Sequence, residues 1–226
     1  MMLLQVTTAT DSVAVDAVTD SVNLFDLLLK GGYVMIPLLL LSIAAIAIFV
    51  ERMLTLKKAD KAPKGLLEQV KSLVAQGNVE QAKMVCKQDN SPIAKMLEKG
   101  VSRIGSPLKN IEVSIENVGK IEIYRLEKNL STLATISGAA PMIGFLGTVT
   151  GMIQAFIAIA QEEGSVSPKL LSEGIYEAMI TTAVGLAVGI IAYLGYNYLV
   201  TQVQKVIHKM EYTSVEFIDL LQEPNA

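Results

Sequence analysis

The stretch that decides the fold is LSTLATISGAAPMIGFLGTVTGMIQAFIAIA, residues 130–160, which carries no charged side chain. A helix needs about 20 apolar residues to cross roughly 30 Å of hydrocarbon, so this stretch is long enough to span a bilayer. Two further uncharged stretches, 31–50 and 178–200, are also long enough. Because 51% of the residues are hydrophobic, the chain is too apolar for an ordinary soluble domain. The sequence therefore predicts an all-α membrane protein with three transmembrane helices.

Lysine and arginine near the ends of these stretches predict the orientation, because cytoplasmic loops are enriched in both. Basic residues are frequent in 51–129 and present in 201–226, but 1–22 has none and 161–173 has only Lys169. The N-terminus is therefore expected in the periplasm and the C-terminus in the cytoplasm. The resulting division is a periplasmic tail (1–22), an interfacial amphipathic helix (23–30), three transmembrane helices (31–50, 130–160 and 174–200), a cytoplasmic helical domain (51–129), a periplasmic loop (161–173) and a cytoplasmic helical extension (201–226).

Helical periodicity continues beyond the second and third spans on the cytoplasmic side. The pattern from Leu108 into the second span is unbroken, and the third span continues down to a stop at Pro224. Each helix would have about 50 residues and a length of roughly 75 Å, of which the bilayer needs about 30 Å. We therefore expect two long helices that extend into a cytoplasmic helical bundle, together with short helices over 64–76, 78–88 and 91–105.

The composition argues against several classes of function. A net charge of −3 offers no basic face for nucleic acid. Cys86 and His208 are the single cysteine and the single histidine, so a disulfide framework or a Cys/His metal site is not expected. No serine, histidine and acid set, paired aspartates or metal set supports an intramembrane hydrolase. We expect neither an enzyme nor a bound cofactor, and we expect Cys86 to be a small buried apolar residue.

Small residues follow one another along the second and third spans. They permit close approach of membrane helices, where no hydrophobic force drives one helix onto another. Ordinary packing within one subunit is one interpretation, and the lining of a central opening in an oligomer is the other. The candidate packing residues are Pro141, Gly144, Gly147, Gly151, Gly185 and Gly189.

Polar residues lie among these glycines. Thr148 shares a face with Pro141 and Gly144, and Thr182 shares one with Gly185. Glu177 precedes Thr181 by four residues near the outer end of the third span, where an unpaired carboxylate is costly and marks an ion path. The alternative is that Glu177 lies in the headgroup region and only solubilises the helix end. Glu177 and Thr182 diverge by roughly 140° on a straight helix, so both can face one opening only if one points toward a neighbouring second span.

Two linked motifs carry a family resemblance. GFLGTVTGMI (144–153) and GIYEAMITTAVGL (174–186) together resemble the paired signature of the ExbB/TolQ/MotA proton-channel family, nearest to ExbB. The likeness extends over 23–222. The chain departs from the family's glycine motif at Thr150, where an aromatic residue is frequent, so the second helix is slightly more polar.

The resemblance implies a subunit of a bacterial inner-membrane motor that uses the proton motive force. It implies a homo-oligomer, a pentamer, that encloses ExbD-like single-span subunits, drives a TonB-like protein and is surrounded by phospholipid. The family's pore-lining threonines match Thr148 and Thr182, and its functional glutamate matches Glu177. A TolQ-like subunit of the Tol-Pal envelope system and a non-conducting membrane scaffold remain alternatives, whereas the four spans of MotA-like chains disfavour flagellar rotation.

The orientation can be tested with reporter enzymes fused along the chain. Fusions after residue 22 and within 161–170 should report the periplasm, because so few basic residues flank those sites. Fusions near Gly100 and at the C-terminus should report the cytoplasm. A cytoplasmic signal from 161–170 would contradict a three-span topology.

Overall fold

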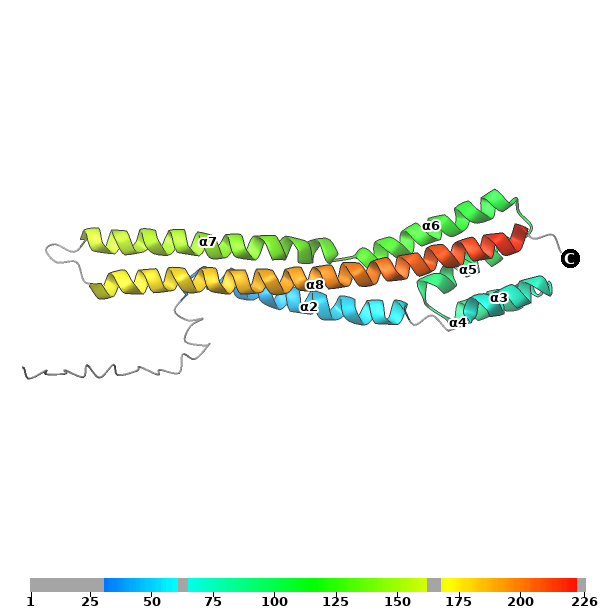
Figure 1. Cartoon of the computed structure of the whole chain (residues 1–226), viewed down its shortest axis with the longest axis horizontal. Coiled ribbons are helices and arrows are strands. Elements are labelled where there is room, and N and C mark those ends of the chain that lie inside the picture. The colour runs from blue at the N-terminus through cyan, green and yellow to red at the C-terminus, as the bar shows by residue number, and fades with distance from the viewer. Residues whose placement is uncertain (1–30, 61–64, 162–167, 223–226) are drawn as a thin grey trace, which may run out of the picture.

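The computed structural model describes residues 31–60, 65–161 and 168–222, and within them the secondary structure is entirely helical (Figure 1). The expected tail and interfacial helix over 1–30, and the stop at Pro224, lie outside the described residues. The helices are α2 (Met35–Ala59), α3 (Leu66–Ala75), α4 (Val79–Gln88), α5 (Pro92–Val101), α6 (Leu108–Glu127), α7 (Leu130–Gln161) and α8 (Pro168–Gln222).

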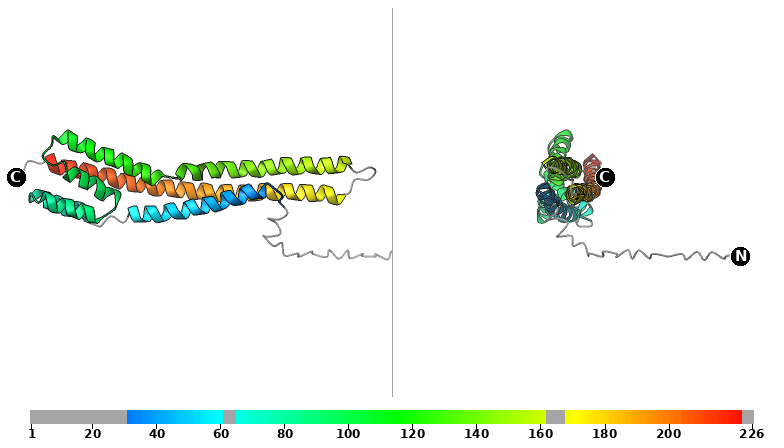
Figure 2. Two further views of the ribbon diagram at one scale, coloured as in Figure 1. Left: turned by 180° about the vertical axis from the view of Figure 1, so that it is seen from behind. Right: turned by 90° about the vertical axis from the view of Figure 1, so that its left-hand side faces the viewer.

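The molecule is a long rod with two unlike halves (Figure 1). In one half α7 and the first part of α8 run side by side with α2 against them, and Figure 2 shows these three helices clustered when viewed along the rod. In the other half the rest of α8 packs with α5 and α6, and α3 and α4 lie beside them. Three segments are long and apolar enough to cross a membrane: Met35–Ala59, Leu108–Gln161 and Leu171–Gln222. The prediction of an all-α membrane protein with three spans is confirmed.

Large apolar side chains cover the outside of the membrane half. In water such a surface would favour aggregation, whereas in a bilayer it contacts acyl chains at no cost. The exposed residues include Ile36, Leu40, Ile43 and Ile46 of α2, Phe145, Leu146 and Ile153 of α7, and Leu186, Ile190 and Leu194 of α8.

The expected unbroken helix from Leu108 into the second span is a wrong prediction. α6 ends at Glu127 and α7 begins at Leu130, because Lys128 is extended and Asn129 has φ +64°. Asparagine tolerates this left-handed conformation better than most residues. The apolar pattern concealed the break because Leu126 and Leu130 are both buried on either side of it.

The C-terminal end of α2 holds this break in place. The guanidinium of Arg52 donates from Nη1 to the carbonyl of Arg125, at 3.1 Å, in the last turn of α6. Glu51 accepts from Arg52 at 2.7 Å and from the Asn129 amide at 3.4 Å. A cation near the C-terminus of a helix is favourable, since it pairs with carbonyls that lack intrahelical partners. By contrast, α8 continues without a break from Pro168 to Gln222, as the sequence predicted.

A small core forms where α5 meets α6 and α8. Leu97 and Val101 of α5 pack in the same buried cluster as Ile115 of α6 and Phe217 of α8. Ser91 caps α5 by accepting from the Ala94 amide at 3.2 Å, with Pro92 at the first helical position. Helices occupy the three expected positions, but the third ends at Val101, before Gly105, whose φ is +95°.

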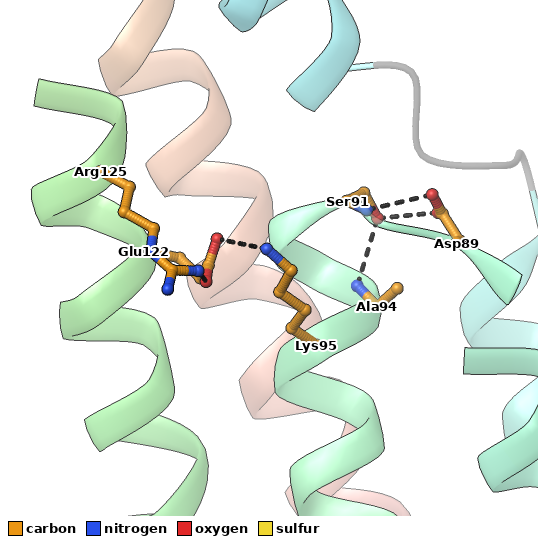
Figure 3. A network of polar contacts seen from close by, with 6 residues as sticks. All are labelled: Asp89, Ser91, Ala94, Lys95, Glu122 and Arg125. Carbon is orange, nitrogen blue, oxygen red and sulfur yellow. Dashed lines mark hydrogen bonds and ion pairs between the residues drawn. The ribbon is translucent and has the colours of Figure 1, made fainter. Parts of the chain in front are cut away.

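A buried carboxylate crosses the contact between α5 and α6 (Figure 3). Glu122 is 5% exposed and accepts from Lys95 of α5 at 3.1 Å and from Arg125 at 2.5 Å. Two charge-assisted hydrogen bonds offset the cost of removing a carboxylate from water. The cluster fixes how α6 sits against α5 just before the break.

Glycines bring α7 and α8 into backbone contact. A β-carbon on Gly185 would lie 2.7 Å from the carbonyl oxygen of Ala140 and 2.8 Å from the α-carbon of Gly144. Gly189 meets Pro141 in the same way, since a β-carbon added to Gly189 would lie 2.5 Å from the proline ring. Gly151 packs on Ala178, and Gly174 on Ala155. Within one subunit, these small faces therefore pack α7 against α8.

Replacing Gly185 with alanine should destabilise the protein by about 1–3 kcal/mol, because the new methyl group overlaps backbone atoms that cannot move aside locally. Gly138→Ala in α7 is the matched control, since a β-carbon there meets nothing within 4 Å. Thermal unfolding in one detergent measures both. Equal shifts in the unfolding midpoint of the two variants would contradict the close approach of α7 and α8.

The lone cysteine should be inert. Cys86 is 1% exposed in α4, and burial raises the pKa of its thiol to about 11, with smaller contributions from the carboxylates of Glu98 and Asp89. At pH 7.5 the thiolate is scarce, so maleimide should alkylate the folded protein more than about a hundredfold slower than the denatured chain. Labelling at equal rates would place Cys86 in an exposed environment.

Candidate functional site

The hydroxyl of Thr182 connects the two membrane helices. Its Oγ1 donates to the carbonyl oxygen of Gly144 in α7 at 3.0 Å, across the contact made by Gly144 and Gly185. The bond depends on those glycines, because any side chain at either position would hold the two backbones apart. Thr182 is half-buried. The sequence singled out its hydroxyl as a candidate, but it gave no sign that the acceptor would be a backbone carbonyl of the same chain.

Thr181 lies deeper in the same contact. It is 1% exposed, packs on Gly147 and donates its hydroxyl to the Ala178 carbonyl of its own helix at 2.8 Å. The sequence placed Thr181 beside Glu177 in a pathway. Within one chain, however, its side chain fills the space that Gly147 leaves and is closed off from the surroundings.

Thr148 lies on α7 and is half-buried. Its Oγ1 donates to the Phe145 carbonyl at 2.6 Å, and the neighbouring Thr150 bonds to the carbonyls of Leu146 and Gly147, each at 3.1 Å. A hydroxyl has one proton to donate and two lone pairs that accept. Because Thr148 and Thr182 donate their protons to backbone carbonyls, both present lone pairs to any water or protonated group that comes near.

Glu177 is half-buried and faces the beginning of α2. Its carboxylate lies against Gly32, where an added β-carbon would be 3.0 Å from Cδ and closer still to Oε1. No hydrogen bond or ion pair joins this carboxylate to another of the described residues. Glu177 is thus a half-buried carboxylate with no hydrogen-bond or ion-pair partner among the described residues, at the end of an otherwise uncharged stretch of α8.

The expected divergence of Glu177 and Thr182 is found in the structure. Thr182 points at α7 and Glu177 at the start of α2, and among the described residues no hydrogen bond joins Glu177 to Thr148 or Thr182. One chain therefore does not assemble a complete polar path from these residues.

Sequence reasoning missed two residues of this region. Gly174 packs on Ala155, and its spacing of four from Ala178 was a signal that could have identified it. Gly32 precedes α2 and had no sequence signal, because only the fold brings it beside Glu177. In the described ranges, no group of three or more His, Cys, Asp or Glu residues is placed to hold a metal ion.

Comparison with known proteins identifies relatives of this chain. Residues 88–212 match the MotA/TolQ/ExbB proton channel family. The ExbB-like 1 biopolymer transport protein of Synechocystis sp. is 33% identical over 190 residues, which is 81% of this chain and 73% of the relative. An ExbB homolog of Methanothermobacter thermautotrophicus is 34% identical over 120 residues, 53% of this chain and 42% of the relative.

The Tol-Pal system protein TolQ of Haemophilus influenzae is 38% identical over 85 residues, 38% of this chain and 37% of that protein. Relatives with both kinds of name therefore match, and the chain spans less than half of some of them. The family match covers both motifs, the helix break and the contact of α7 with α8, and it extends over more than half of the chain. The chain belongs to the MotA/TolQ/ExbB proton channel family.

Proposed function

We propose that this chain is the proton-channel stator subunit of an ExbB-ExbD-TonB-like motor in the bacterial inner membrane. In this role it uses the proton motive force to energise transport across the outer membrane and catalyses no reaction. The observation that carries the proposal is the half-buried carboxylate of Glu177 at the end of the uncharged stretch of α8, in a membrane half where the hydroxyls of Thr148 on α7 and Thr182 on α8 offer lone pairs. Membership of a proton channel family supports it.

The channel would form between copies of the chain. In the described membrane half, a cavity of about 170 Å³ between α2, α7 and α8 is lined by apolar residues such as Phe49, Leu133 and Ala192, so it offers no polar route for a proton. The glycine faces of α7 and α8 are used within the subunit. We therefore place the path in a homo-oligomer, a pentamer in this proposal, around the membrane helix of an ExbD-like partner.

The partner would supply the carboxylate that moves protons through the centre. No aspartate occurs within 31–50, 130–160 or 174–200, and Glu177 lies toward the periplasmic end in the proposed orientation. Glu177 would then take up protons and pass them inward. Thr148 and Thr182 would hold water with their lone pairs, and Thr182 would also keep α7 and α8 in register.

A TolQ-like role in the Tol-Pal envelope system is the second candidate, favoured by the 38% identity to a TolQ protein. The two roles differ in the protein that the motor drives and not in the proton channel itself. Expression in bacteria that lack both kinds of stator separates them. An ExbB-like protein restores receptor-driven uptake, whereas a TolQ-like protein restores the integrity of the outer membrane.

The proposal predicts which side chains carry protons. The chain, co-purified with its single-span partner and sealed into vesicles, should pass protons in response to a voltage, as read by an internal pH dye. Glu177→Ala should lower this flux by at least about tenfold, because it removes the group that takes up protons. Glu177→Gln should be milder if the native residue works while protonated, and Thr148→Val and Thr182→Val should give smaller losses.

Glu173→Gln is the matched control, since Glu173 is an exposed carboxylate about one turn earlier on α8. It should leave the flux unchanged. Assembly with the partner should be normal in every variant, as checked by size-exclusion chromatography. Full flux through the assembled Glu177 and threonine variants would contradict the channel and favour a non-conducting scaffold.

A further inference from the structure

Gly32 occupies an unusual place beside Glu177. It lies in the turn before α2, its φ of +63° is left-handed, and the carboxylate of Glu177 takes the space in which a side chain at position 32 would begin. A β-carbon there would be 3.0 Å from Glu177 Cδ and would overlap Oε1. Two requirements thus meet at this residue, since both the backbone conformation and the neighbouring carboxylate favour glycine.

The first amides of α2 do not hold this carboxylate. The amides of Met35 and Ile36 donate to the carbonyls of Gly32 at 3.2 Å and Tyr33 at 3.3 Å, and Pro37 has no amide proton. The steric contact with Gly32, and not helix capping, therefore limits where the Glu177 carboxylate can lie.

The start of α2 is itself held firmly against the other membrane helices. Leu38 is fully buried and packs in one cluster with Met35 and with Ala140 of α7, and Val184 of α8 lies against that cluster. The position of Gly32 relative to α8 is therefore fixed by packing one turn further along α2. The Glu177 side chain comes from α8, but its orientation also depends on where α2 places Gly32.

We infer that Gly32 is a positioning residue for proton transfer, because its missing side chain lets α2 hold the carboxylate of Glu177 in the direction that the channel requires. The inference rests on the proposed function, in which Glu177 takes up protons. In this inference α2, which supplies none of the candidate polar residues, sets the orientation of the Glu177 side chain on α8.

The test uses the chain with its single-span partner in vesicles and the same flux measurement. Gly32→Ala displaces the Glu177 carboxylate and should lower the proton flux about ten- to a hundredfold, since a misplacement of about 1 Å can cost that much. Glu177→Asp should also lower it, because the shorter side chain falls short of Gly32. The double variant should recover most of the flux, since a shorter acid fits against a larger residue.

Two further variants separate this effect from backbone strain. Gly105→Ala imposes left-handed strain at φ +95° with nothing within 4 Å of the new methyl group. It should keep full flux. Gly32→Asn relieves the strain, because asparagine tolerates this conformation, but it still displaces the carboxylate. It should match Gly32→Ala, and it serves as the test if the alanine variant fails to assemble.

Each outcome has one meaning. Normal flux in an assembled Gly32 variant overturns the inference, as does a loss that Glu177→Asp does not rescue, since Gly32 would then act only through the fold. If Glu177→Gln and Glu177→Ala leave the flux unchanged, the proposed function of Glu177 fails, and the inference fails with it. Loss in Glu177→Ala with normal flux in Gly32→Ala overturns the inference alone.

Discussion

The structure depends on the backbone contact between α7 and α8. Gly144 and Gly185 approach so closely that a single methyl group on Gly185 would overlap the Ala140 carbonyl. In a bilayer no hydrophobic force drives helices together, because lipid tails are as apolar as leucine, so attraction must come from tight packing and from hydrogen bonds between helices. The Thr182 bond to the Gly144 carbonyl is such a bond, and it forms only because both positions lack a side chain.

This contact decides what the remaining faces of the two helices can do. Since the glycines meet inside one subunit, the proposed channel has to use the flanking faces, where Thr148 is half-buried and large apolar residues are exposed. The carboxylate of Glu177 on α8 lies away from both threonines, against Gly32 at the start of α2. All three spans therefore take part in the proposed site, with α7 and α8 supplying hydroxyls and α2 holding the carboxylate.

The half of the rod that contains α3 to α6 is joined to the membrane half through one continuous and one interrupted helix. α8 passes from the membrane half into the bundle without a break, whereas α6 and α7 are separated at Lys128 and Asn129 and pinned by Glu51 and Arg52. The Nε of Arg52 is buried without a partner among the described residues, which lowers stability where α2, α6 and α7 meet. Beyond it, Glu122 joins α6 to α5 through its ion pair with Lys95, and it forms a second ion pair with Arg125 of its own helix.

The sequence by itself determined the fold class, the three spans, the continuity of α8 and the family, because uncharged length, helical periodicity and the two motifs are local properties of the chain. It also determined which residues are small enough for close packing. Only the tertiary structure decided that these glycines meet within one subunit, that Thr182 bonds to the Gly144 carbonyl and that Gly32 lies against Glu177. Each of these contacts joins residues more than 30 positions apart in the sequence, and no local sequence pattern encodes such a contact. The break at Lys128 and Asn129 was hidden for another reason, since the change in backbone conformation at these two residues left the apolar residues on both sides buried.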